Sequence, residues 1–278
     1  MMLANYREAL RDAKLSIQID PKFEKGYLRV AKCCILLGDL VQTEQNIKRF
    51  LEIDATNTAL KGEIQSLKQL RTSEEKANEC YAKQDYRTCL FHIDSALKTA
   101  QACQRYKLMK AECLALLGRT DEANDIAIGI MKIDTTNCDA IYVRGLTLYY
   151  SDNLEKGIMH FERSLQLDPD HKKAKAMRIK SRSLKEKKEN GNECFKSGKY
   201  RDALAIYTEA LTIDPLNKEI NSKLHYNRAL VNTKAIIILL ITQLFRNLWY
   251  NFSSEIFAMP SQIAQVHSKL MTSTSKHF

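Results

Sequence analysis

Glycine and proline are scarce in this chain, which has 9 Gly and 4 Pro among 278 residues. Folds made mainly of strands need many tight turns, and these two residues supply most turn conformations. A collagen-like fold is excluded too, because it needs Gly at every third position. Hydrophobic residues make up 45% and charged residues 27%, so the chain can still form a buried core. The composition favours an all-α protein.

Motifs for catalysis and metal binding are missing as well. The eight cysteines contain no Cys-x-x-Cys pair, so we expect no zinc ribbon or thioredoxin site but reduced core thiols. The six histidines form no spaced pair with Cys or an acid, and no Gly-x-x-x-x-Gly-Lys or Gly-x-Ser-x-Gly motif occurs. We therefore expect a protein that is no enzyme and needs no metal and no cofactor.

Long apolar runs are also absent. The longest, 235–241, is followed by Thr242, Gln243 and Arg246, whereas a membrane-spanning helix needs about 20 apolar residues. The first ten residues lack the basic and then apolar pattern of a signal peptide. These features predict a cytoplasmic protein, with the nucleus as a second location, and no membrane association.

The charge balance is strongly positive, with a formal net charge of +10. Such a charge suits an acidic partner. The lysine-rich segment 180–196 lacks aromatic interleaving suited to base stacking, since Phe195 is its one aromatic residue, so nucleic acid is not the expected partner. Its lysines are better explained by a helix whose long side chains cover apolar neighbours.

The sequence repeats itself. Residues 6–21 and 200–215 both open with Tyr-Arg, an acid, Ala and Leu, and both close with Ile-Asp-Pro. Similar Ile-Asp or Leu-Asp endings recur between them, 34 residues apart from Pro21 to Ala55 and from Thr135 to Pro169. The two longer gaps between endings are 46 residues each, which is one period plus an insertion of 12.

Small and large residues keep fixed places within the period. The last complete copy has Gly191, Gly198, Ala203, Tyr207 and Ala210 before its closing proline, and earlier copies repeat parts of this pattern. A period of 34 with this pattern resembles the tetratricopeptide repeat (TPR), a helix–turn–helix unit. The resemblance implies an all-α TPR α-solenoid, a superhelix of antiparallel helix pairs.

The register of the repeats divides the chain into four parts. Each 12-residue insertion is rich in Lys, Gln and Leu without proline, and we interpret it as a capping helix that runs into the next repeat. The first repeat retains only its second helix, and the pattern is lost after Lys234. The predicted parts are a partial TPR block with capping helix (1–71), a three-repeat block with capping helix (72–184), the start of a third block (185–234) and an atypical tail (235–278).

A candidate binding site follows from a second resemblance, to TPR chaperone cofactors. In these proteins a two-carboxylate clamp, Lys-x-x-x-Asn, then Asn, then Lys-x-x-x-Arg on successive first helices, grips a C-terminal Glu-Glu-Val-Asp. This sequence has Lys188 and Asn192 at the first set of positions and Asn227 at the second. Lys25 and Arg29 fit the third set at the other end of the chain. Residues four apart share one helical face, so each pair can converge on a carboxylate.

The middle block departs from the clamp pattern. Glu74 replaces the Lys, Met109 the second Asn, and Asp139 and Val143 the last pair, so that only Asn78 remains. Carboxylates at these positions would repel an acidic peptide, and we expect no carboxylate clamp there.

Two clamp blocks around a non-clamp block resemble the DnaJ-related TPR co-chaperones, over about residues 1–234. Those proteins carry a J domain with a His-Pro-Asp loop, which does not occur here. The resemblance implies a monomeric co-chaperone scaffold that binds acidic C-terminal tails of cytosolic heat-shock chaperones. The alternative is a general TPR assembly scaffold that binds another helix or peptide, with clamps that no longer function.

Overall fold

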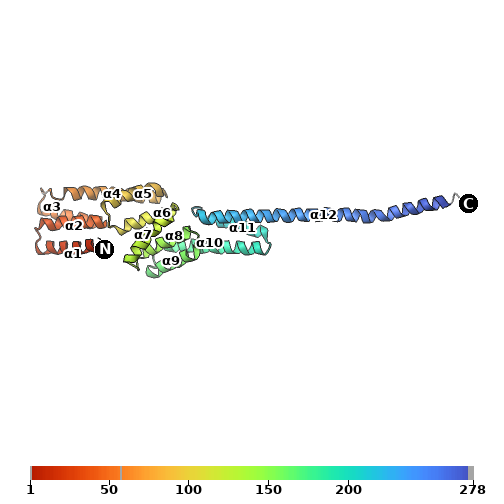
Figure 1. The fold of residues 1–278 in the computed structure, drawn as a ribbon. Helices are drawn as coiled ribbons and strands as arrows, with labels where there is room; N and C mark the ends of the chain where they lie inside the picture. The colour runs from red at the N-terminus through yellow and green to blue at the C-terminus, as the bar shows by residue number, and fades with distance from the viewer. Residues whose placement is uncertain (1, 57, 275–278) are drawn as a thin grey trace. The chain divides into compact units, whose positions relative to one another are not determined.

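The computed structural model describes residues 2–56 and 58–274, and within these ranges all regular structure is helical (Figure 1). The helices, in chain order, are α1 (Met2–Ile19), α2 (Glu24–Leu37), α3 (Leu40–Ile53), α4 (Lys61–Ala82), α5 (Tyr86–Thr99), α6 (Gln104–Leu116), α7 (Thr120–Ile133), α8 (Cys138–Tyr150), α9 (Leu154–Leu167), α10 (Lys172–Lys196), α11 (Tyr200–Ile213) and α12 (Lys218–Thr274).

The helices form two compact units. The first unit comprises Met1–Lys185 together with Ile213–Asn221, and the second comprises Glu186–Thr212 together with Ser222–Phe278. In the first unit, successive helices from α1 to α9 pack against one another along the chain. Most contacts are therefore local in sequence, as expected for stacked helix pairs.

Helix ends follow from local chemistry. Asp39 caps the start of α3, where its side chain accepts a hydrogen bond from the Gln42 backbone N–H at 2.9 Å. Asp85 and Asn137 cap α5 and α8 in the same way. Gly38 ends α2 with a φ of 74°, in the left-handed region that favours glycine. These short-range signals keep the connections between paired helices tight.

The recurrent Ile-Asp and Leu-Asp endings mark the ends of second helices. Helices α3, α7, α9 and α11 stop at the Ile or Leu of each ending. The aspartate that follows α7, Asp134, is extended, and its Oδ1 accepts from the backbone N–H and the hydroxyl of Thr136 at 2.9 and 2.7 Å. The carboxylate thus holds the turn that ends each repeat.

Close packing within a helix pair depends on the predicted small residues. A Cβ at Gly145 of α8 would lie 2.7 Å from Cε1 of Phe161 on α9, which is fully buried. A Cβ at Gly191 of α10 would lie 2.6 Å from Tyr207 on α11. Each glycine therefore makes room for a large ring of its partner helix. The predicted fold class, an all-α TPR α-solenoid, is confirmed.

The two predicted capping segments are continuous with the helices that follow them. Helix α4 covers most of the first insertion and the first helix of the next repeat, and α10 does the same for the second insertion. Neither helix is interrupted, which is consistent with the lack of proline in both segments.

Helix α12 is long and apolar. Within the described ranges it is the one helix whose length and hydropathy would allow it to cross a membrane, over Lys218–Asn251. Its large apolar side chains from Ile236 to Tyr250 are all exposed. From the sequence we considered only the apolar run 235–241, which is too short to span a membrane. Length and composition do not by themselves show insertion into a bilayer, so the expected lack of membrane association stays a prediction.

Candidate peptide-binding site

The second unit brings together three of the predicted binding residues. Lys188 and Asn192 lie four residues apart on α10, and thus on one face of that helix. Asn227 of α12 donates a hydrogen bond from Nδ2 to Oδ1 of Asn192 at 3.3 Å. Tyr207 of α11 donates its hydroxyl to the same oxygen at 2.7 Å. Three helices therefore converge on the Asn192 amide.

This arrangement fixes which way the Asn192 amide points. Its oxygen accepts from both Tyr207 and Asn227, so its Nδ2 group remains as the donor for an anionic ligand. Tyr207 is 2% exposed, and burial raises its pKa, so the phenol keeps the proton that it donates. Tyr207 thus orients an amide that a carboxylate could reach.

Sequence reasoning missed this role for Tyr207 and treated it as a packing residue. The equivalent position of the preceding repeat, one period and one insertion earlier, is Phe161, which has no hydroxyl. The signal was available in that difference between two copies of the repeat, because a hydroxyl at a core position needs a hydrogen-bond partner.

The first unit contains the other predicted pair. Lys25 and Arg29 lie four residues apart on α2, and both are exposed. They present two cations on one face of the helix. Lys25 and Arg29 belong to one unit, and the set around Asn192 belongs to the other.

The positions at which the middle block departs from the clamp pattern lie around a single cavity. This cavity, of about 390 Å³, is lined by residues of α4, α6, α8 and the start of α10, including Glu74, Asn78, Met109, Asp139 and Val143. The register of the repeats therefore places equivalent positions of successive first helices in one groove.

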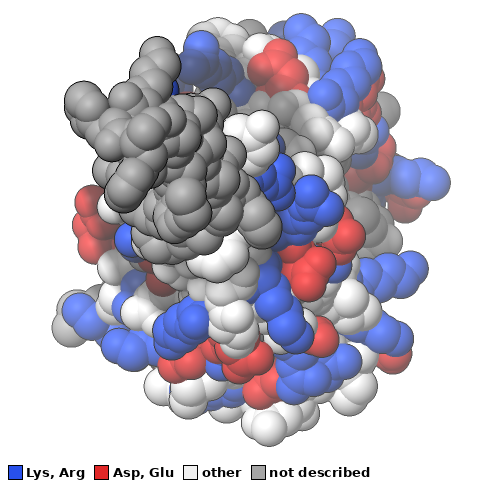
Figure 2. Space-filling view, turned by 90° about the vertical axis from the view of Figure 1, so that its right-hand side faces the viewer, with Lys and Arg blue, Asp and Glu red and all other residues white. Residues whose placement is uncertain are grey.

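The positive net charge is not gathered into one area on the face that Figure 2 shows, where Lys and Arg lie among Asp and Glu. Attraction of an acidic segment to that face would depend on individually placed cations. In the described part of the chain, no group of three or more His, Cys, Asp or Glu residues is arranged to hold a metal ion.

Paired helices on a 34-residue period define a tetratricopeptide-repeat protein, a class in which stacked repeats act as a scaffold for protein interactions. Over 234 residues the chain is 44% identical to the human protein DnaJ homolog subfamily C member 7. The matched region covers 84% of this chain and 47% of that relative. A Dictyostelium discoideum homolog of the same protein is 30% identical over 226 residues, 81% of this chain and 42% of the relative.

The predicted resemblance to the DnaJ-related TPR co-chaperones is thus confirmed, and the chain belongs to the family of DnaJ homolog subfamily C member 7. It spans about half the length of the curated relatives it matches. Among solved structures, the TPR domain of P58(IPK) is 20% identical with a TM-score of 0.49, and the likeness covers 80% of this chain and 63% of that one. No family model matches the chain.

Proposed function

We propose that this chain is a co-chaperone scaffold of the cytoplasm or nucleus. Its TPR grooves bind the acidic C-terminal tails, of the Glu-Glu-Val-Asp type, of cytosolic heat-shock chaperones. The observation that carries the proposal is the hydrogen bond between Asn192 of α10 and Asn227 of α12. Asn192 lies on the face of α10 that also carries Lys188. The 44% identity to a DnaJ homolog supports the co-chaperone class.

The chemistry of the set suits a carboxylate. Lys188 supplies a cation. Asn192 supplies an N–H donor that is oriented, because the oxygen of the same amide already accepts from Tyr207 and Asn227. A C-terminal carboxylate accepts several such hydrogen bonds at once, and charge-assisted bonds are about twice as strong as neutral ones. Lys25 and Arg29 offer a second pair of cations in the first unit.

The test is a titration of the full chain with a fluorescent peptide ending in Glu-Glu-Val-Asp and with its C-terminally amidated copy. Amidation removes one charge and one acceptor from the group that the site reads. We expect the free-acid peptide to bind about tenfold more tightly, a difference of about 1.4 kcal/mol. Lys188→Gln and Arg29→Gln should each weaken binding of the free-acid peptide. Each should also reduce the difference in affinity between the free-acid and the amidated peptide.

The matched control is Lys175→Gln, which removes an exposed lysine from another face of the same helix, α10. It changes the net charge equally but leaves the Asn192 face intact. If the two peptides bind alike, or if Lys175→Gln weakens binding as much as Lys188→Gln, the clamp is wrong and the general assembly scaffold becomes the better function.

A further inference from the structure

The cavity of the middle block has a different chemistry from the Asn192 site. Three carboxylates line it, those of Glu74, Glu112 and Asp139, against two cations, Arg105 and Lys173. The lining thus has one negative charge in excess. Leu108, Met109 and Val143 add apolar surface between the charged groups.

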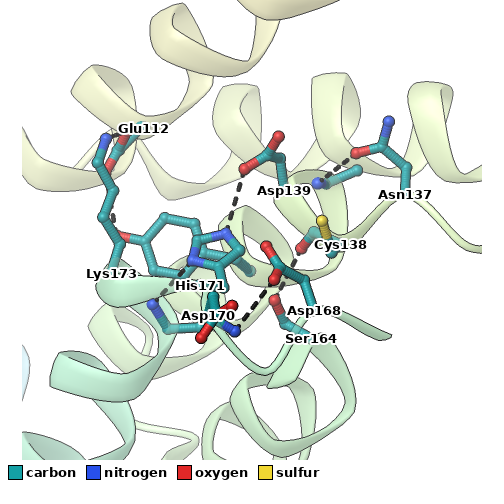
Figure 3. A network of polar contacts seen from close by, with 12 residues as sticks. Glu112, Asn137, Cys138, Asp139, Ser164, Asp168, Asp170, His171 and Lys173 are labelled. Atoms are coloured by element: carbon teal, nitrogen blue, oxygen red, sulfur yellow. Dashed lines mark hydrogen bonds and ion pairs between the residues drawn. The ribbon is translucent and has the colours of Figure 1, made fainter. Parts of the chain in front are cut away.

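Glu112 is the most deeply placed of these carboxylates, at 5% exposed. Its Oε1 accepts from the hydroxyls of Tyr81 at 2.7 Å and Tyr142 at 3.0 Å. Its Oε2 receives the ammonium group of Lys173 at 2.7 Å (Figure 3). A buried carboxylate is costly unless it is hydrogen-bonded and paired, so this position requires a cation beside it.

Lys173 meets that requirement with a side chain that lies partly in solvent. Its Nζ is 4.5 Å from the centroid of the Tyr81 ring and 3.1 Å from the Tyr81 hydroxyl, while the side chain as a whole is 49% exposed. A carboxylate beneath and an aromatic face beside an ammonium group form a favourable place for any cation. Lys173 reaches it from the first turn of α10 on a long flexible stem.

Asp139 offers a further acceptor. Its Oδ1 lies 3.1 Å from Nε2 of His171, and His171 Nδ1 accepts the backbone N–H of Ala174, so Nε2 carries the proton (Figure 3). The Asp139 side chain is 64% exposed, and its Oδ2 makes no hydrogen bond or ion pair with the residues that the structure describes. Glu74, by contrast, is occupied by Arg105 and by the Tyr106 hydroxyl at 2.8 Å.

We propose that this cavity binds a Lys or Arg side chain of a partner peptide, which sits against Glu112 and Tyr81 in place of Lys173. Asp139 Oδ2 then accepts from a second donor of the same peptide. Lys173 acts as an internal competitor that keeps Glu112 paired while no peptide is bound. The inference does not rest on the proposed function, and its charge preference is the opposite of that of the Asn192 site.

The experiment uses the full chain and an N-acetylated, C-amidated peptide in which two lysines alternate with leucine and valine. A matched peptide carries Nε-acetyl-lysine at both positions and so has the same backbone without the charge. Binding is measured by fluorescence anisotropy at low and high salt. We expect the lysine peptide to bind at least tenfold more tightly at low salt, with the difference shrinking as salt rises.

Variants separate the roles of the side chains. Asp139→Asn keeps the hydrogen bond to His171 but removes a charge, and should weaken the lysine peptide by about threefold to tenfold. Lys173→Gln removes the internal competitor and should raise the affinity for the lysine peptide several-fold. Glu155→Gln, which removes a 73% exposed carboxylate elsewhere in the same unit, is the control and should change nothing.

Equal binding of the lysine and acetyl-lysine peptides would overturn the proposal. So would a Lys173→Gln variant that binds no more tightly than the parent while its circular dichroism melt is unchanged. If Lys173→Gln is unstable, Asp139→Asn decides, because that side chain is mostly in solvent. Binding of the Glu-Glu-Val-Asp peptide is measured in parallel and should not weaken in the Asp139→Asn variant. A failure of the lysine-peptide test would therefore overturn only this inference and leave the proposed function standing.

Discussion

Replacing Asp214 by alanine should strongly destabilise the first unit. This aspartate follows α11 and is 1% exposed. Its Oδ2 accepts from the hydroxyls of Tyr149 at 2.9 Å and Tyr150 at 3.4 Å, both on α8, and lies 3.6 Å from Nζ of Lys180. Its Oδ1 accepts from the backbone N–H of Leu216 at 3.1 Å. One side chain thus fastens Ile213–Asn221 to a helix more than 60 residues earlier.

The size of the loss follows from the groups left behind. Tyr149 and Tyr150 are 0% and 6% exposed, so each buried hydroxyl would lose its charged hydrogen-bond partner. An unsatisfied buried polar group costs about 1–3 kcal/mol, and partial entry of water lowers the sum for two of them. We expect a loss of about 3 kcal/mol, a large part of the about 5–15 kcal/mol that stabilises an ordinary domain.

The assay is hydrogen exchange followed by mass spectrometry, because a stack of repeats opens in segments and need not unfold in one step. A loss of about 3 kcal/mol corresponds to about a 150-fold rise in the opening equilibrium. This rise should appear in α8 and in residues 213–221.

The control is Asp134→Ala, at the equivalent place of an earlier repeat, where the carboxylate bonds to Thr136 within its own turn. That variant should affect only its own turn. If Asp214→Ala changes exchange in α8 no more than Asp134→Ala does, the reasoning from buried hydroxyls is wrong.

Two further predictions concern helix packing and the tail. Gly145→Ala should lower the free energy of unfolding by about 1–3 kcal/mol, because the new Cβ would meet Phe161. Gly129→Ala should raise it by as much as about 1 kcal/mol, because alanine favours the helix and nothing lies within 4 Å of the new Cβ. Thermal melts by circular dichroism check both, and shifts of the same sign would contradict the packing argument. Deleting residues 235–278 should leave the monomer expected from the sequence. The full chain should instead self-associate in water, because its apolar side chains from Ile236 to Tyr250 are exposed. Light scattering after gel filtration, with and without detergent, measures this, and a monomeric full chain without detergent would refute it.

Much of the helical framework could be predicted from the sequence, because the signals for it are local. The Ile-Asp and Leu-Asp endings placed the ends of α3, α7, α9 and α11. Gly145 and Gly191 marked the close approach of paired helices. The absence of proline in the insertions predicted that α4 and α10 would continue into the following repeats. Each of these inferences needs only residues within one repeat.

The tail was harder to predict. The loss of the repeat pattern after Lys234 was visible, but the continuous helix from Lys218 to Thr274 was not. No Ile-Asp or Leu-Asp ending marks where this helix stops, and the apolar run alone does not reveal how far a helix extends.

The candidate site was predictable in part. Lys188, Asn192 and Asn227 came from the clamp pattern that the sequence resembles, placed on the repeat register, and the structure joins the two asparagines by a hydrogen bond. The orienting hydroxyl of Tyr207 was missed, because the register treats that position as a place for a large ring and says nothing about a polar group on it.

The order and pairing of the helices were determined by the sequence itself, because turns, caps and small residues act over a few positions. Which side chains share a cavity or a hydrogen bond was decided only by the tertiary structure. Lys173 reaches Glu112, and Asp214 reaches Tyr149, across 61 and 65 residues of chain. Such contacts exist because separate helices stack at fixed distances, and no pattern within one repeat specifies which polar atoms that stacking brings face to face.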